Sequence, residues 1–273
     1  MTVNIRNFKV GQLQCTVIHD GGGQGTIEQI AGIFPQLTPD EIEQATLAAG
    51  FDPNANEFSM NILLIQVGTR RILVDTGNGA ARGGRLLEGL DQIGLTPEAI
   101  DMVVITHGHP DHIGGIVDDT GKLVFTNAEH LMGQAEWEYW LAEAEKSEDH
   151  FARPTLFLLQ GHIRLVKKEK EIMPGVWVVL AAGHTPGHLG LLLESDGKRL
   201  LHIADTAHIP VQISRPEWSP RYDSAPEEGA VTRRRLVEWA AREQLPVLAY
   251  HFGFPGLGRV LEQDGAFRWQ FGL

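Results

Sequence analysis

The sequence has little of what several common protein classes are built from. Cys15 is the one cysteine among 273 residues, which excludes an internal disulfide framework and a four-cysteine zinc or iron–sulfur site. Basic residues number 23 against 35 acidic ones, giving a formal charge of −12, and this balance disfavours nucleic-acid and anionic-membrane partners. No run of 18 apolar residues occurs and no signal-peptide pattern opens the chain, so we expect a cytoplasmic protein.

The remaining composition, 42% hydrophobic and 21% charged, is that of a globular protein. No linker or low-complexity run divides the chain, so we expect one domain over residues 1–273. Strand and helix patterns alternate, which favours an α/β fold. The main expected elements are hairpins over 61–75 and 189–205, helices beginning at Thr38 and covering 127–146 and 228–244, and strands over 102–105, 246–250 and 267–271.

Histidine is plentiful, with 12 in so acidic a chain, and its densest cluster is His107-Gly108-His109-Pro110-Asp111-His112. An apolar strand runs directly into this loop. Three imidazoles and a carboxylate on six residues are costly unless they bind something or face water. Imidazole nitrogen and carboxylate oxygen suit zinc, and comparable sites accept manganese, iron or cobalt.

Four residues of one loop cannot all surround a single ion and leave an open position. We therefore expect His107 and His109 to bind one ion, and Asp111 and His112 a second. Further ligands must come from other strand ends, which gather at one edge of a sheet. The candidates are His188 for the first ion, His251 for the second and Asp205 as a bridge between them.

The segments THGHPDHIGG, AGHTPGH, HIADT and AYHFGFPG, in this order, resemble the metallo-β-lactamase-fold hydrolases. The C-terminal third is most similar to the branch containing methyl parathion hydrolase, lactonases and arylesterases. The resemblance implies a four-layer αββα sandwich with a dinuclear metal site at the sheet edge. It also implies the ligand set His107, His109, His188, Asp111, His112, His251 and bridging Asp205.

Two divalent ions so placed would activate a bridging water at neutral pH. Asp111 is the candidate for orienting that nucleophile or moving its proton. Some lactonases of the family have a tyrosine three residues after the bridging aspartate, and here that position is His208, which becomes the candidate oxyanion donor ahead of Tyr222. Phe252, Phe254 and Trp218 are candidates for lining a substrate pocket. For His184, a supporting role is favoured over a ligand role.

These observations predict a metal-dependent hydrolase of neutral lactones or carboxylic esters, with a side activity on phosphotriesters. The alternative is a thioesterase of glyoxalase II type, which shares the histidine motifs but usually ends in a basic glutathione-binding segment. A β-lactamase, a nuclease, an iron-containing redox protein and a non-catalytic metal-binding module fit the sequence less well. The resemblance also suggests a homodimer, with residues 26–56 as the candidate contact.

Overall fold

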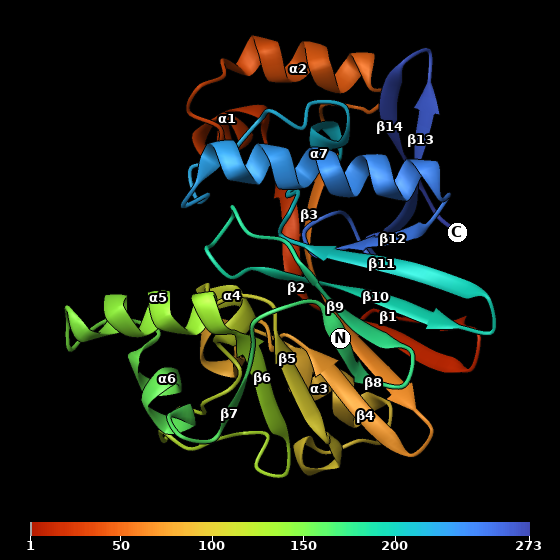
Figure 1. The fold of residues 1–273 in the computed structure, drawn as a ribbon. Coiled ribbons are helices and arrows are strands. Elements are labelled where there is room, and N and C mark those ends of the chain that lie inside the picture. The colour runs from red at the N-terminus through yellow and green to blue at the C-terminus, as the bar shows by residue number, and fades with distance from the viewer. Residues whose placement is uncertain (1) are drawn as a thin grey trace.

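The computed structural model of the protein describes residues 2–273, and Met1, with which the expected domain begins, lies outside the described residues. Within this range the strands form two seven-stranded sheets that pack against each other, with helices on the outer faces (Figure 1). This is the αββα sandwich that the sequence predicts. None of the helices in the described range is long and apolar enough to cross a membrane.

The first half of the chain forms one sheet, in which spatial order equals chain order. Strands β1 to β4 pair antiparallel, whereas β4 to β7 run parallel, so that their carboxyl ends share one edge. The strands are β1 (Ile5–Val10), β2 (Leu13–Gly25), β3 (Asn56–Val67), β4 (Arg70–Val74), β5 (Met102–Ile105), β6 (Glu129–Gly133) and β7 (Ile163–Val166).

The second half forms the other sheet, also in chain order, and the chain crosses between the sheets through residues 167–169. All neighbours in this sheet are antiparallel except β11 and β12, which are parallel. The strands are β8 (Lys170–Met173), β9 (Val176–Leu180), β10 (Leu189–Ser195), β11 (Lys198–Ala204), β12 (Pro246–Ala249), β13 (Leu257–Gln263) and β14 (Ala266–Phe271).

Helices cover both outer faces. Helix α7 lies over the second sheet, with α1 and α2 beside it, whereas α5 and α6 lie against the first sheet (Figure 1). The helices are α1 (Ile27–Ile33), α2 (Pro39–Ala48), α3 (Leu86–Gln92), α4 (Pro110–Ile113), α5 (Gln134–Glu145), α6 (Arg153–Leu159) and α7 (Pro226–Arg242). Three 3-10 turns complete the set: η1 (Ala80–Arg82), η2 (Pro97–Ala99) and η3 (Pro210–Ile213).

The core follows the two-residue alternation of the strands. On β3, Ile62 and Leu64 pack under the helices of the first sheet, whereas Leu63 and Ile65 pack between the two sheets. Cys15 also lies in the layer between the sheets, where burial raises the pKa of its thiol to about 12. The lone cysteine is therefore a small buried apolar group.

Most of the expected elements are present. Both hairpins form, and Thr38 caps α2 in a capping box with Glu41. The helix expected over 127–146 is partly wrong, because residues 129–133 form β6, a buried strand parallel to β5, and α5 begins only after Gly133. Strand β13 was not expected, and it pairs with β12 and β14.

Candidate metal centre

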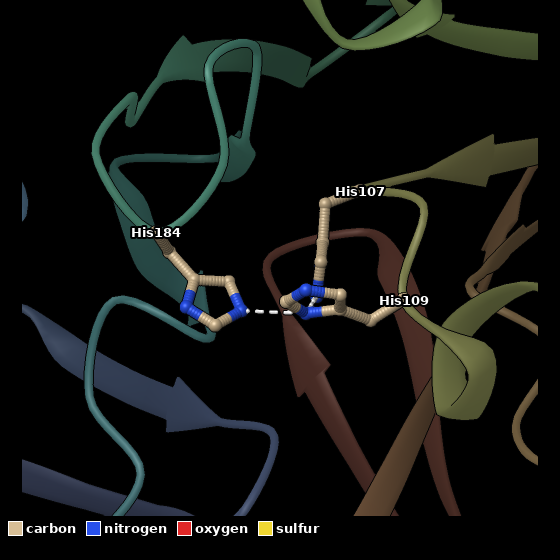
Figure 2. Close-up of side chains that lie close together, drawn as sticks. All are labelled: His107, His109 and His184. Carbon is tan, nitrogen blue, oxygen red and sulfur yellow. Dashed lines mark hydrogen bonds between the residues drawn. The ribbon is translucent and has the colours of Figure 1, made fainter. Parts of the chain in front are cut away.

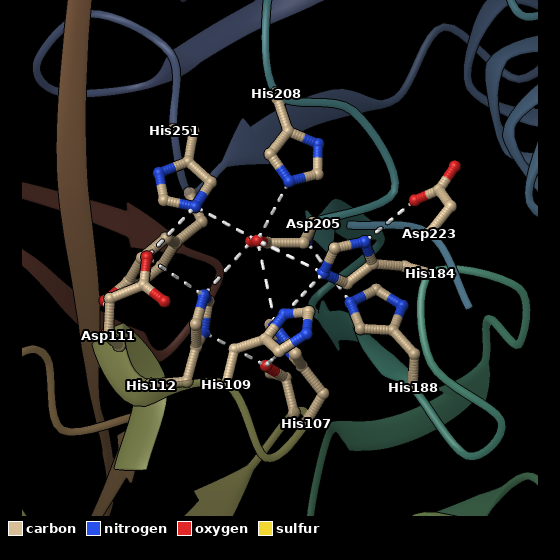
Figure 3. A network of polar contacts seen from close by, with 12 residues as sticks. His107, His109, Asp111, His112, His184, His188, Asp205, His208, Asp223 and His251 are labelled. Carbon is tan, nitrogen blue, oxygen red and sulfur yellow. Dashed lines mark hydrogen bonds and ion pairs between the residues drawn. The ribbon is translucent and has the colours of Figure 1, made fainter. Parts of the chain in front are cut away.

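The HGHPDH segment changes direction in its middle. His107 and His109 lie in the loop that follows β5, and Pro110 then begins the short helix α4, which carries Asp111 and His112. The loop pair and the helical pair therefore come from different backbone segments, and His107 and His112 lie side by side with ring centroids 3.9 Å apart. Figure 3 shows both pairs around Asp205.

The first group consists of His107, His109 and His184, whose ligand atoms lie within 4.8 Å of one another. His109 Nδ1 lies 3.0 Å from His107 Nε2 and 2.9 Å from His184 Nε2 (Figure 2). Burial lowers the pKa of His107 and His184 well below the usual range and that of His109 to about 4. Three neutral imidazoles therefore bring a ring nitrogen each to within 4.8 Å of one another, an arrangement that suits a cation.

The second group consists of Asp111, His112 and His251. Asp111 Oδ2 lies 3.4 Å from His251 Nε2 and 3.9 Å from His112 Nε2. Burial alone would lower the pKa of His112, but Asp205, Asp75 and Asp111 outweigh it and raise that pKa well above its usual value. Burial is likewise outweighed at His251, where mainly Asp205 raises the pKa. This group is thus rich in negative charge, whereas the first contains only imidazoles.

Asp205 lies between the two groups. Its Oδ2 is 3.0 Å from His251 Nε2 and 3.8 Å from His107 Nε2, and its Oδ1 is 3.3 Å from His112 Nε2. Burial disfavours its charge, but His112 and His251 hold its pKa well below the usual range. Asp205 directly follows β11, where the pairing with β12 shifts register and Ala204 takes a left-handed φ of 43°. The backbone is therefore bent at the point where this carboxylate enters the site.

The residues fit a metal site because polar atoms at its centre lack hydrogen bonds. Within residues 2–273, His112 Nε2 and Asp205 Oδ1 are buried and lie 3.3 Å apart, yet neither forms a hydrogen bond of good geometry. Buried polar atoms are normally satisfied, and an unpaired one costs about 1–3 kcal/mol. Imidazole nitrogen and carboxylate oxygen are also the donors that zinc and related divalent ions prefer.

In each group, one histidine contacts a carboxylate outside the group through its Nδ1 atom. Asp75 Oδ2 lies 2.8 Å from His112 Nδ1 and accepts a hydrogen bond from the Thr106 hydroxyl. Asp223 Oδ1 lies 2.8 Å from His184 Nδ1, and its other oxygen accepts from the buried Arg233. Such contacts fix the tautomer and orientation of a ligating imidazole. His184 therefore has the surroundings of a ligand.

His188, the expected ligand, is not in either group. Its Nδ1 lies 3.0 Å from the Ala181 carbonyl oxygen, and its Nε2 accepts a hydrogen bond from the Asp205 backbone N–H at 3.2 Å. Both ring nitrogens are occupied by the backbone, so this imidazole supports the Asp205 turn. Of the two histidines of AGHTPGH, the structure thus brings His184 rather than His188 into a cluster of candidate ligand atoms.

The candidate catalytic residues lie at the site. The side chain of Asp111 is 28% exposed, which makes it the accessible carboxylate of the centre. His208 Nε2 lies 3.3 Å from Asp205 Oδ2, and its ring stacks on that of His251. Tyr222, the weaker candidate, is exposed.

An apolar cavity of about 600 Å³ adjoins the centre. Phe58, which lines it, stacks on His251 with ring centroids 4.3 Å apart, and Ile209 of the lining follows His208 directly. Phe254 also lines the cavity. Phe252 and Trp218 do not. Phe252 packs in the core against Trp269, and Trp218 packs against Phe34.

Sequence reasoning missed Asp223, Arg233 and Phe58. Asp223 belongs to the EWSPRYDS segment that carries the family resemblance, but an isolated aspartate gives no sign of which histidine it meets. Arg233 is one of three consecutive arginines on α7, and it alone of the three is buried. Phe58 precedes the hairpin over 61–75, and nothing in the pattern places it against His251.

Comparison with known proteins gives one family and several relatives. The family profile described as the Metallo-beta-lactamase superfamily matches residues 55–245. An N-acyl homoserine lactonase from Bacillus sp is 30% identical over 169 residues, which is 61% of this chain and 62% of the relative. One from Bacillus thuringiensis is 26% identical, over 67% of this chain and 65% of that protein. The chain thus matches less than two thirds of the length of these relatives.

Two solved structures align along nearly the whole chain. One is described as AidC, a dizinc quorum-quenching lactonase, in complex with a product; it is 25% identical, with a TM-score of 0.88, and covers 99% of this chain and 98% of its own. The other is described as the hydrolase AbOPH in the beta lactamase superfamily. It is also 25% identical, with a TM-score of 0.85, and covers 100% of this chain and 99% of its own.

Proposed function

Because the chain belongs to the Metallo-beta-lactamase superfamily, we propose that it is a dinuclear metal-dependent hydrolase of lactones or carboxylic esters. The observation that carries the proposal is the convergence of two ligand groups on Asp205 beside an apolar cavity. The lactonases among the similar proteins support it. The proposed ligands are His107, His109 and His184 for one ion and Asp111, His112 and His251 for the other, with Asp205 between them.

When bound, the two ions supply Lewis-acid polarisation of the scissile carbonyl and an activated water as nucleophile. We propose zinc for both, as in the similar dizinc lactonase. Asp111 accepts the proton of the attacking water, since its carboxylate is partly open to solvent within the second group. His208 donates from Nε2 to the oxygen that gains charge, because Asp205 holds that nitrogen toward the centre.

The cavity indicates the kind of substrate. Its lining is mostly apolar, with Ile30, Ile33 and Phe58 among its side chains, and within the described residues that lining contains no lysine or arginine. A neutral ester or lactone with an apolar substituent fits such a cavity. A glutathione thioester carries carboxylates that this lining would leave unpaired, so the thioesterase alternative is disfavoured.

A substrate panel tests the proposal. We expect the highest kcat/KM for acyl-homoserine and simple lactones, a lower value for p-nitrophenyl esters, and a weak side activity on paraoxon-type phosphotriesters. Within an acyl series, each methylene that enters the cavity should raise kcat/KM up to about fourfold, since burying one contributes about 0.8 kcal/mol. Preference for S-lactoylglutathione would overturn the proposal, as would a metal content other than two ions per chain.

One domain over residues 1–273, a cytoplasmic location and a homodimer with contacts in residues 26–56 stay predictions. Chemical cross-linking together with light scattering tests the last of these.

A further inference from the structure

Glu136 is a carboxylate with no exposed surface, on the first turn of α5. Its Oε1 accepts a hydrogen bond from the Gly108 backbone N–H at 2.9 Å and another from the Trp140 indole N–H. Its Oε2 accepts from the Gly187 backbone N–H, also at 2.9 Å. Carboxylates are seldom fully buried without such partners. Burial raises the pKa of Glu136, and the polar contacts from Thr185, Gly108, Gly187 and Trp140 oppose that shift.

The two glycines belong to the two loops that form the first ligand group. Gly108 stands between His107 and His109, and Gly187 follows His184 by three residues. The two loops come from different halves of the chain, after β5 and after β9, and α5 is the helix that touches both. One side chain therefore connects segments that are far apart in sequence.

The packing around Glu136 leaves no room for a side chain at Gly108 or at Gly187. A β-carbon on Gly187 would lie 2.1 Å from the Glu136 backbone nitrogen, and one on Gly108 would lie 2.4 Å from Trp140 Cδ1. Such distances are far inside van der Waals contact, so both loops need glycine where α5 meets them. The indole of Trp140 also packs edge-on against the His109 ring, with centroids 5.4 Å apart. Helix α5 thus sets the position of both loops through close contact as well as hydrogen bonds.

We propose that Glu136 is a positioning residue that holds the His107/His109 loop and the His184 loop at the separation the first ion requires. The inference rests on the proposed metal site. Within residues 2–273, no hydrogen bond joins the second group to α5, and Asp75 instead contacts His112 of that group. Loss of the Glu136 carboxylate should therefore lower the affinity for the first ion far more than the affinity for the second.

The variant Glu136→Gln tests this, because it keeps the shape of the side chain. Both oxygens of Glu136 accept hydrogen bonds, so an amide nitrogen in either place faces at least one N–H donor. We expect the affinity for the first ion to fall about 10–100-fold, as is typical when a residue that orients a ligand is lost. The affinity for the second ion should stay close to that of the unchanged protein. The measurement is stepwise Co²⁺ titration of the metal-free protein, followed by visible absorption and calorimetry.

Two further variants make the result specific. Glu138→Gln, two residues along on the exposed side of α5, removes the same charge away from the loops and should leave both affinities unchanged. Trp140→Phe removes the indole N–H that donates to Glu136, and it should lower the affinity for the first ion in the same direction as Glu136→Gln but less. If Glu136→Gln does not fold, Trp140→Phe still distinguishes the two ions.

Every outcome of the Co²⁺ titration either supports or overturns the role proposed for Glu136. Selective weakening of the first ion supports the proposal. An equal loss of affinity for both ions, or no change in either affinity, overturns the proposal. Two bound ions in the unchanged protein would still support the proposed function in that case. If the unchanged protein takes up no ion at all, the proposed function fails and this inference fails with it.

Discussion

The two ligand groups meet at Asp205, yet they are built on different principles. The first contains only imidazoles that burial keeps unprotonated, and the charge of its supporting Asp223 is balanced by Arg233. The second contains a carboxylate and is surrounded by negative charge that raises the pKa of its histidines. The first group therefore depends on accurate placement of neutral donors, whereas the second attracts a cation by charge. Metal binding at the first group should thus respond most to changes that move its loops, and metal binding at the second to changes that remove negative charge.

The largest expected effect comes from removing what the groups share. Asp205→Asn takes away the carboxylate between them, and we expect hydrolysis to fall below detection and both ions to bind more weakly. Metal analysis of the purified variant, alongside lactone hydrolysis, checks this. A fully loaded and fully active variant would disprove the dinuclear assignment.

The next comparison separates the two histidines of the AGHTPGH loop. His184→Ala should reduce the metal content from two ions to one, because it removes a donor of the first group. His188→Gln should keep both ions and lose stability instead, by about 1–3 kcal/mol, since a backbone partner of the ring is left unpaired. Metal analysis and urea unfolding of both variants give the answer. The opposite pattern would restore His188 as the ligand.

A smaller effect should follow from changing one support at a time. Asp223→Asn should lower the affinity for the first ion about 10–100-fold, and Asp75→Asn should lower the affinity for the second by the same factor. Each carboxylate orients one proposed ligating imidazole. Competition with a coloured chelator measures both affinities. Equal losses at both ions in either variant would show that the groups are not independent.

The smallest effect concerns His202, which is fully buried and belongs to neither group. Burial lowers its pKa to about 3, and within residues 2–273 neither ring nitrogen has a hydrogen-bond partner. The unfolded chain takes up this proton near pH 6.5, so His202 costs no stability above that pH and progressively more below it. Between pH 7 and pH 5 the cost should reach about 2 kcal/mol. Urea unfolding of metal-free protein should show that His202→Leu removes this part of the pH dependence; an unchanged slope would place the titration elsewhere.

Much of this was predictable from the sequence, and the errors have physical causes. The α/β class follows from local patterns, in which apolar strands end in polar loops, whereas the αββα sandwich is what the family resemblance implies. His184 and His188 could not be ranked in this way, because both lie in one loop and only its hydrogen bonds decide which ring is free. Glu136 was equally hidden, since it is one of several acidic residues in an ordinary helical pattern, and its partners are backbone groups from distant loops. The helical pattern over 127–146 hides strand β6. Its strand conformation depends on pairing with β5, which the local sequence does not reveal.

The single crossing of the chain between the sheets, at residues 167–169, has a consequence for assembly. A cut there would give two fragments, each carrying one complete sheet. The first fragment would hold His107, His109, Asp111 and His112, and the second His184, Asp205 and His251, so each proposed ion would need donors from both. The apolar layer between the sheets would hold such fragments together, and bound divalent metal would add cross-links between them.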